Sequence, residues 1–223
     1  MKIIELHKSV TESNDRDAEK LREELKERGT FLVNVMSSPG AGKTTLLSRV
    51  ITDLKDELSI AVMEADIDAS VDAEKIEALG AKSIQLHTDG MCHMDAGMTR
   101  MGIEEMGIEE IDLAFLENVG NLICPAEFDT GAAKNLMILS VPEGDDKPLK
   151  YPLMFETSDA LAVSKTDALP YFDFDMDKLY ERVKRLNPAI EIFPVSAKTG
   201  EGMEELEQWL KSETLKWKEI PHA

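Results

Sequence analysis

A glycine-rich stretch between two apolar segments carries the residue types that bind phosphate groups. Residues 37–45 read Ser-Ser-Pro-Gly-Ala-Gly-Lys-Thr-Thr; they follow the apolar run 31–36 and precede the apolar run 46–51. Strand, tight loop and helix in this order are the context that a phosphate-binding P-loop requires. Glycine lets backbone N–H groups close around a phosphate, and the helix that follows adds free N–H groups and the positive end of its dipole. The stretch therefore predicts binding of a nucleoside triphosphate.

Two side chains of this loop have distinct chemical roles. The Lys43 ammonium group is expected to bridge the β- and γ-phosphates, and the Thr44 hydroxyl is expected to bind Mg²⁺. The first glycine of the usual motif is replaced by Ser37, so a glycine-rich turn without a ligand is the alternative interpretation. The predicted nucleotide contacts in the loop are Ser38, Pro39, Gly40, Ala41, Gly42, Lys43, Thr44 and Thr45.

Two later motifs indicate which base is bound. The sequence Lys-x-Asp at 165–167 and the sequence Ser-Ala-Lys at 196–198 each follow an apolar run, and they resemble the fourth and fifth guanine motifs of GTPases. The Asp167 carboxylate can accept hydrogen bonds from N1–H and from the exocyclic N2 amino group of guanine, a donor pair that adenine lacks. Two such charge-assisted bonds, at about 1.5–3 kcal/mol each, give on the order of 10²–10⁴ discrimination, so GTP is favoured over ATP.

The remaining residues of these motifs surround the base. We expect the Lys165 side chain to cover the plane of the base and the Ala197 backbone N–H to contact O6 of guanine, with Ser196 and Lys198 completing the loop. Ser164 stands where the usual motif has asparagine, and we expect this replacement to weaken the bracing between loops more than the recognition of the base. A Lys-x-Asp sequence alone is a weak signal, but its position after a P-loop and before Ser-Ala-Lys makes it specific.

Acidic residues that follow apolar runs are candidates for binding Mg²⁺ and for sensing the γ-phosphate. Mg²⁺ prefers oxygen ligands, and Asp66 and Asp72 follow the run 60–65. Glu117 ends a later apolar run and, with Gly120, resembles the switch segment of GTPases, in which the glycine N–H binds the γ-phosphate. The predicted Mg²⁺ ligands are Thr44, Asp66, Asp72 and Glu117. The predicted catalytic residues are Lys43, Thr44, Asp66, Glu117 and Gly120.

The residue that follows this glycine bears on the rate of hydrolysis. Ras-like GTPases place a glutamine there to position the attacking water, whereas this chain has Asn121 after Gly120. We therefore expect slow intrinsic turnover of GTP to GDP and phosphate, below roughly 1 s⁻¹, by the isolated chain.

A second set of residues has the chemistry of a transition-metal site. Cys92 and His93 are adjacent and Cys124 lies close behind Gly120 in the sequence; thiolate and imidazole groups suit soft or borderline divalent metals. One chain offers too few such groups for a closed tetrahedral site, which two chains sharing an ion would complete. The alternative is that the cysteines are buried packing residues. Of the methionines in the segment 91–106, Met94, Met98 and Met101 have helical spacing, which favours an apolar core or a dimer face over soft metal ligands.

Four stretches together resemble the nickel-inserting GTPases of [NiFe]-hydrogenase maturation, which with their urease accessory relatives belong to the dimerising P-loop GTPases. The stretches are 38–45, 89–96, 117–129 and 143–148, of which 117–129 is the most specific. The resemblance implies a homodimer that forms on GTP binding and holds Ni²⁺, and often Zn²⁺, at the subunit interface. It implies Cys92, His93 and Cys124 as the ligands. It also implies a small nickel-binding accessory protein and the hydrogenase large-subunit precursor as partners.

The chain departs from the family pattern near its N-terminus. Family members often carry a histidine-rich stretch or a Cys-x-x-Cys-type nickel site, and this sequence has neither, which puts nickel storage in doubt. Two other interpretations stay open beside the hydrogenase one. The first is a urease-type nickel insertion GTPase. The second is a regulatory GTPase or a P-loop phosphotransferase whose cysteines are structural.

Composition restricts the partners and the location. Twenty-five basic against 44 acidic residues give a formal net charge of −19, which repels nucleic acid and anionic membranes. The sequence has no apolar run of membrane-spanning length and no signal-peptide pattern at Met1–Glu5, so we expect a cytoplasmic protein. Two cysteines make no disulfide framework.

The elements that position these residues alternate along the chain. Seven apolar runs, with helical patterns between them, predict an α/β fold of the P-loop NTPase type: a mostly parallel central sheet of about seven strands flanked by helices. Residues 30–223 form the predicted GTPase domain, with the metal-binding segment at 91–129. A polar N-terminal segment and helix precede it over 1–29, with the helix itself predicted over 15–28.

Overall fold

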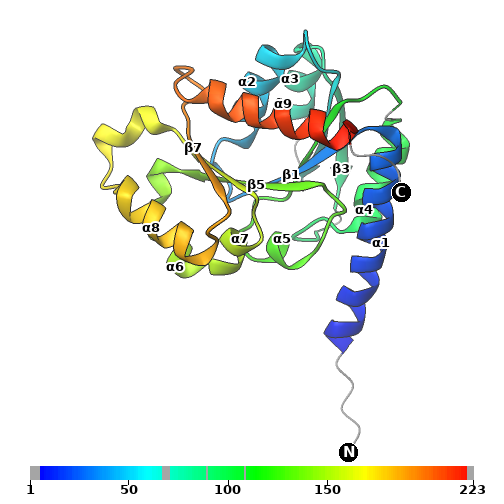
Figure 1. The fold of residues 1–223 in the computed structure, drawn as a ribbon, viewed down its shortest axis with the longest axis horizontal. Helices are drawn as coiled ribbons and strands as arrows, with labels where there is room; N and C mark the ends of the chain where they lie inside the picture. The colour runs from blue at the N-terminus through cyan, green and yellow to red at the C-terminus, as the bar shows by residue number, and fades with distance from the viewer. Residues whose placement is uncertain (1–5, 67–70, 89, 108, 220–223) are drawn as a thin grey trace, which may run out of the picture.

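The computed structural model describes residues 6–66, 71–88, 90–107 and 109–219. Within these residues, seven strands form one sheet in the order β3-β2-β4-β1-β5-β6-β7, and every pairing is parallel (Figure 1). The predicted α/β fold with a seven-stranded parallel sheet is confirmed. The strands are β1 Phe31–Ser37, β2 Ile60–Asp66, β3 Lys82–His87, β4 Leu113–Glu117, β5 Lys134–Ser140, β6 Ala160–Ser164 and β7 Glu191–Pro194.

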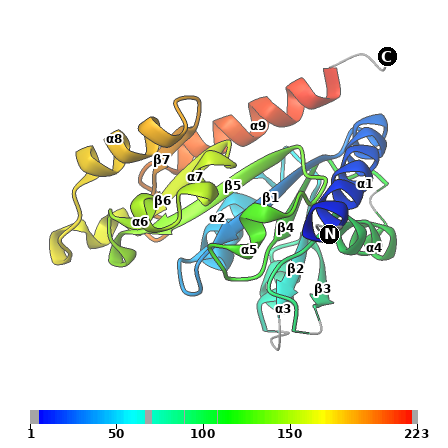
Figure 2. The same cartoon turned by 90° about the horizontal axis from the view of Figure 1, so that it is seen from below.

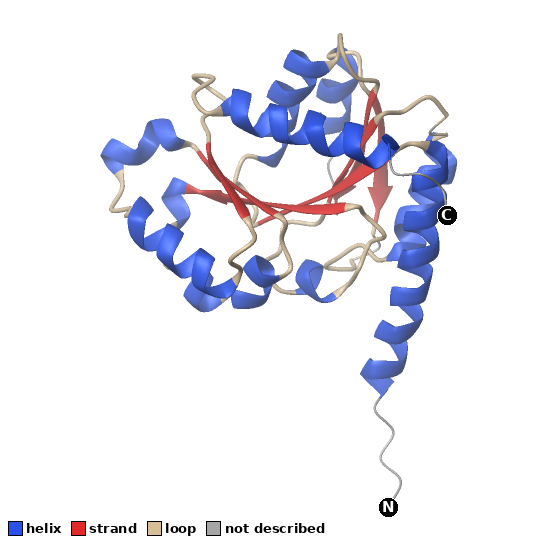
Figure 3. Cartoon of the chain, in the orientation of Figure 1, coloured by secondary structure: helices blue, strands red, loops and turns tan. Residues whose placement is uncertain are grey.

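Helices cover both faces of the sheet, as Figures 1 and 3 show. One face packs against α2 (Lys43–Leu54), α3 (Val71–Ala78) and α9 (Met203–Glu219). The other face packs against α1 (Leu6–Arg28), α4 (Ala96–Met106), α7 (Pro152–Glu156) and α8 (Met176–Leu186). Shorter elements are α5 Cys124–Glu127, α6 Lys147–Lys150 and the 3₁₀ turns η1 Val141–Glu143 and η2 Thr166–Tyr171.

The central strand explains where a ligand would lie. All seven residues of β1 are buried, as expected of a strand covered on both faces. From β1 the chain passes through α2 to the β2 side of the sheet, and it later returns to place β5 on the other side of β1. The loop after β1 therefore lies at a reversal in strand order, outside the carboxyl ends of the strands, which is where open α/β sheets bind ligands.

The first helix is longer than the sequence pattern indicated. We predicted a helix over 15–28 after an irregular segment, whereas α1 begins at Leu6. Its sequence contains neither glycine nor proline, so nothing in it terminates a helix. Ala18, Leu21 and Leu25 are buried, and Figure 2 shows α1 lying beside α4 at one side of the molecule.

A half-buried carboxyl group on α9, hydrogen-bonded to Asp53 on α2, makes stability depend on pH. Burial, with a hydrogen bond to Asp53 and the charge of that residue, raises the pKa of Glu207 from 4.5 to about 7. The folded state favours the protonated form of Glu207. Its contribution to folding stability is therefore complete below the unfolded-state pKa and is lost as the pH rises through about 7. We expect Glu207→Gln to raise the unfolding free energy by about 1 kcal/mol near pH 8, with allowance for solvent screening, and by less near pH 5.

Thermal unfolding at the two pH values measures this effect. A gain of about 1 kcal/mol corresponds to about 2–4 °C in Tm for a chain of this size. Glu205→Gln, an exposed position on the same helix, is the matched control and should show no such pH dependence. An equal shift in Tm for Glu207→Gln at both pH values would contradict the assignment.

Candidate functional site

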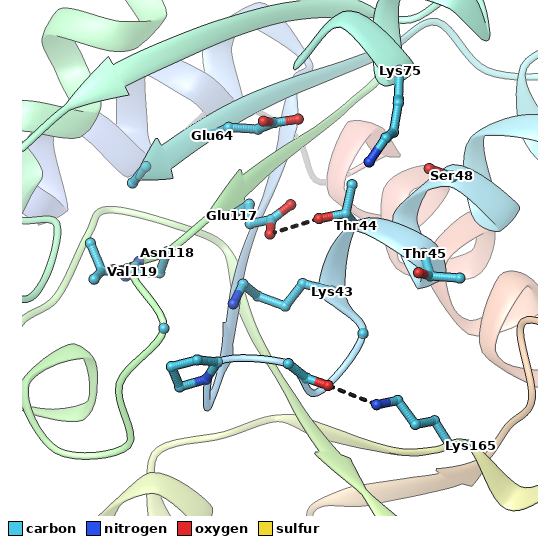
Figure 4. A pocket seen from close by; sticks show the side chains of 15 residues that line it. Lys43, Thr44, Thr45, Ser48, Glu64, Lys75, Glu117, Asn118, Val119 and Lys165 are labelled. Atoms are coloured by element: carbon cyan, nitrogen blue, oxygen red, sulfur yellow. Dashed lines mark hydrogen bonds between the residues drawn. The ribbon is translucent and has the colours of Figure 1, made fainter. Parts of the chain in front are cut away.

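The P-loop after β1 lines a cavity of about 720 Å³ (Figure 4). Gly40 and Gly42 have φ angles of +76° and +96°, a region that favours glycine, so the loop can turn tightly into α2. The Lys43 amine points into the cavity and donates a hydrogen bond to the Ser37 hydroxyl over 3.1 Å. The Ser38 hydroxyl donates to the Glu143 carboxylate, which ties the loop to η1. The lining residues from the loop are Pro39, Gly40, Gly42, Lys43, Thr44 and Thr45.

The end of β4 meets the P-loop across this cavity. The Thr44 hydroxyl lies 3.3 Å from Oε1 of Glu117, as the dashed line in Figure 4 marks. A Cβ atom at Gly120 would lie 3.1 Å from Cγ and 3.2 Å from the backbone nitrogen of Pro39. A side chain at this position would force Pro39 to shift by a few tenths of an ångström, so the segment 117–120 packs directly on the phosphate-binding loop.

A hydroxyl and a carboxylate that converge in this way are a suitable donor set for Mg²⁺. Of the four predicted ligands, Thr44 and Glu117 are brought together. Asp66 ends β2 and Asp72 lies in α3, but the side chains of both are outside the part of the chain that the structure describes. Their roles as Mg²⁺ ligands stay predictions.

Two residues that the sequence reasoning missed also line the cavity. Glu64 on β2 is only 4% exposed, and Lys75 on α3 extends its amine toward Thr44 in Figure 4. A charged residue inside an otherwise apolar strand was the available signal for Glu64. Lys75 gave no local signal, because only the crossover from β2 brings α3 over the P-loop.

The guanine motifs line an adjacent cavity of about 260 Å³. The Ser196 hydroxyl donates to Oδ1 of Asp167 over 2.8 Å, and the Lys198 amine lies 3.8 Å from Oδ2. The Ser196 hydroxyl thus orients the Asp167 carboxylate before any base is bound, with the exposed Lys198 amine adding only a distant charge. The lining residues are Ala41, Gly42, Thr45, Leu46, Ser164, Lys165, Asp167, Ala168, Ala197 and Lys198.

Ser164 still connects its strand to the P-loop, and the expectation that it braces the loops less than asparagine would stays a prediction. Its hydroxyl donates to the Ala41 carbonyl oxygen over 2.7 Å, and the Lys165 amine donates to the Gly40 carbonyl oxygen over the same distance. Serine is shorter than asparagine, but β6 and the P-loop lie close enough for the hydroxyl to span the gap. Lys165 has a φ of +60°, which turns its side chain over the loop.

The candidate metal ligands lie on two neighbouring loops. The Cys92 sulfur is 3.7 Å from Nδ1 of His93, and the His93 ring stacks on Phe128 with 3.8 Å between ring centroids. Hydrogen bonding with Cys124, together with burial, raises the pKa of the Cys92 thiol. Burial lowers the pKa of His93, against the opposing charges of Asp95 and Glu127.

The described part of one chain does not by itself close a metal site. Among the residues that the structure describes, no group of three or more His, Cys, Asp or Glu side chains is arranged to hold an ion. Cys92 is exposed and Cys124 is half-exposed, so both thiols are accessible to a further ligand from outside the chain. Neither cysteine is simply a buried packing residue.

The methionines divide between the core and the surface. Met94 and Met106 are 1% and 3% exposed and belong to the core between α4 and the sheet, and Met98 packs against it. The core interpretation of the helical spacing is thus confirmed for Met94 and Met98. Met91 and Met101 are 40% and 69% exposed. Met91 lies next to Cys92, so apolar surface adjoins the accessible thiol.

A buried amide connects the phosphate-sensing segment to the first metal loop. Oδ1 of Asn118 accepts hydrogen bonds from the backbone N–H of Met94 over 3.1 Å and of Val119 over 2.9 Å. Its Nδ2 donates to Asn34 on β1, which in turn donates to Asn135 on β5. Asn118, which follows Glu117, therefore holds the backbone of Met94, which follows His93.

Comparison with known proteins places the chain in a defined group. Residues 31–194 match the family described as CobW/HypB/UreG, nucleotide-binding domain. The chain is 46% identical over 210 residues to the hydrogenase maturation factor HypB of Rhizobium leguminosarum bv. viciae, covering 94% of this chain and 70% of the relative. It is 41% identical over 212 residues to HypB of Escherichia coli K12, covering 95% and 73%.

Two solved structures share the whole fold. HypB from Helicobacter pylori, solved in complex with nickel, superposes with a TM-score of 0.86 at 36% identity, covering 95% of this chain and 99% of that one. HypB from Archaeoglobus fulgidus gives a TM-score of 0.85 at 36% identity, covering 91% and 98%. Among the described residues of the present chain, no helix is long and apolar enough to cross a membrane.

Proposed function

The chain belongs to the CobW/HypB/UreG family of nucleotide-binding proteins, and on this premise we propose that it is a GTP-hydrolysing nickel carrier of hydrogenase maturation. In this proposal GTP binding favours a homodimer, and the dimer holds Ni²⁺ between its subunits. Hydrolysis to GDP and phosphate then resets the dimer. The cytoplasmic location expected from the sequence stays a prediction.

The choice of GTP rests on the geometry around Asp167. Ser196 holds its carboxylate at a cavity bounded by Ala197 and by the P-loop, where the N1–H and N2 amino groups of guanine can donate to it. Lys43 and the N-terminus of α2 then face the phosphates in the larger cavity. Thr44 and Glu117 would hold Mg²⁺, which would neutralise the negative charge of the phosphates.

The observation that carries the proposal is the position of the segment 117–120 between the two sites. On one side Glu117 contacts Thr44 and Gly120 packs on Pro39. On the other side Asn118 holds the backbone of Met94, next to His93. A shift of this segment on binding a γ-phosphate would therefore move a metal loop, which couples nucleotide state to metal affinity.

The metal chemistry supports a site shared by two subunits. Cys92, His93 and Cys124 provide thiolate and imidazole donors, which suit Ni²⁺ and Zn²⁺. A second subunit would double this set. In the same proposal the partners are a small nickel-binding accessory protein, which supplies the ion, and the hydrogenase large-subunit precursor, which receives it.

Equilibrium sedimentation tests the proposal. The protein is measured with GDP or with a non-hydrolysable GTP analogue, each with and without Ni²⁺. We expect a monomer with GDP, a dimer with the GTP analogue, and tighter nickel binding by the dimer. Equal nickel affinity of separated subunits, whichever guanine nucleotide is present, would reject the coupling and leave only a GTPase.

Urease is a second candidate target. A relative from Helicobacter hepaticus, 39% identical over 214 residues, is described as a hydrogenase/urease maturation factor. The chemistry of the present site would serve either apoenzyme, since both require Ni²⁺. Addition of the nickel-loaded dimer to each apoenzyme in turn would distinguish them.

A further inference from the structure

Helix α1 contacts both loops that carry the candidate metal ligands. The Asn14 side chain on α1 accepts a hydrogen bond from the Ala96 backbone N–H over 3.0 Å and donates one to the Asp129 carbonyl oxygen over 2.8 Å. Ala96 follows His93 by three residues, and Asp129 follows Cys124 by five. One amide therefore joins two loops that are far from it and from each other in sequence.

The loop after Cys124 has a second attachment to the same helix. Arg22 donates to both carboxylate oxygens of Asp129, over 2.8 and 2.7 Å, and to the Ala132 carbonyl oxygen over 3.0 Å. Both contacts to Asp129 come from one guanidinium nitrogen, Nη2, while Nε donates to Ala132, so the planar group is held at two points of the loop. Asn14 and Arg22 lie on one helix whose apolar side is buried, so they hold Asp129 from a rigid support.

The first metal loop is fixed at its junction with α4. Ala96 is the first residue of α4, and its N–H is one of the groups that have no partner within their own helix. The Asp95 side chain accepts a hydrogen bond from the Met98 N–H, and the Asn14 side chain accepts one from the Ala96 N–H. The start of α4, and with it the exit of the loop that carries Cys92 and His93, is therefore set by α1.

We propose that Asn14 is a positioning residue of the nickel site, which rests on the proposed function: it sets the spacing between Cys92-His93 and Cys124. The two loops also meet through the stack of His93 on Phe128, which permits sliding, and through Asn118 and Asn121, which bond the backbone of Met94 and Cys92 on the Gly120 side of Cys124. Asn14 is the contact that also ties the Asp129 side of the second loop. The amide fixes one backbone atom on each side. Metal affinity depends on such placement to within about 0.5 Å.

The test uses Asn14→Ala, with Ser13→Ala as the matched control at the exposed neighbouring position. The first measurement needs no metal. With oxidised glutathione, the thiols of Cys92 and Cys124 form one disulfide and each glutathione disulfide consumed yields two reduced glutathione molecules. These are the chain's two cysteines, so the monomer without nucleotide can form one intramolecular disulfide, and electrophoresis without reductant separates it from a disulfide between two chains. We expect Asn14→Ala to slow this ring closure about fivefold or more, because the thiols are no longer held together.

The second measurement is nickel affinity in the presence of a GTP analogue. We expect Asn14→Ala to weaken nickel binding about tenfold, as for other groups that orient metal ligands, while the affinity for GTP changes less than about twofold. Disulfide rates and nickel affinities equal to those of Ser13→Ala would overturn the proposal. So would a parallel loss of GTP affinity and Tm, which would show a general role in folding.

The two proposals fail in different ways. Absence of nickel binding by the unmodified protein would reject the proposed function, whereas the disulfide rates would still decide whether Asn14 sets the spacing of the thiols. Normal nickel binding by the unmodified protein and by Asn14→Ala, with unchanged disulfide rates, would reject the role of Asn14 alone.

Discussion

We expect Asp167→Asn to lower the affinity for GTP by at least about 100-fold and to raise the affinity for xanthosine triphosphate. The carboxylate accepts two hydrogen bonds from guanine, and an amide can accept only one while its NH₂ group opposes the N2 amino group. Xanthine carries a carbonyl oxygen at that position and accepts from the amide. The Ser196 hydroxyl, 2.8 Å from Oδ1, would still orient the new side chain.

Competition binding with the two nucleotides measures the exchange of specificity. The chain has a formal net charge of −19, so removal of any acidic group reduces the repulsion of a nucleotide. Asp173→Asn, at an exposed position nearby, removes the same charge and is the matched control. If Asp167→Asn bound GTP as Asp173→Asn does, the residue would not read the base and the second motif would be a surface feature.

The fold could be predicted because its signals are local. Parallel strands that are covered on both faces are continuous apolar runs, and β1, β5 and β6 show this plainly. The apolar face of α2 and the glycine-rich loop before it likewise lie within a few residues of one another. The start of α1 was missed because a polar helix without breakers looks like an irregular segment.

The candidate site could be predicted only in part, because its contacts connect distant segments. Lys43, Thr44 and Asp167 belong to short motifs with known chemistry. The bond from Asn14 to Asp129 spans 115 residues, and the bond from Asn118 to Met94 depends on the register of β4 beside β1. No periodicity encodes such pairs. The one available hint was Asn34, a polar residue inside an apolar strand, which proves to belong to the buried amide chain.

Cys92→Ala should have the largest effect on metal binding. In a site shared across a two-fold axis, one substitution removes two thiolate donors from the same ion, one from each subunit. Loss of a group that merely orients a ligand costs about 10–100-fold in affinity, so loss of two ligands should weaken nickel binding by more than about 100-fold. In the absence of nickel the affinity for GTP should not change, because Cys92 does not line the phosphate or base cavity.

Nickel titration in the presence of a GTP analogue, with GTP affinity measured in parallel, tests this expectation. Met91→Ala is the control, because Met91 is the exposed neighbour of Cys92 and provides both apolar area and a soft sulfur. If Met91→Ala no longer bound nickel and Cys92→Ala still did, the ligand would be the Met91 thioether and not the Cys92 thiol. If neither variant lost nickel, the ion would be bound away from this loop, and the contact between Asn118 and Met94 would have no bearing on metal affinity.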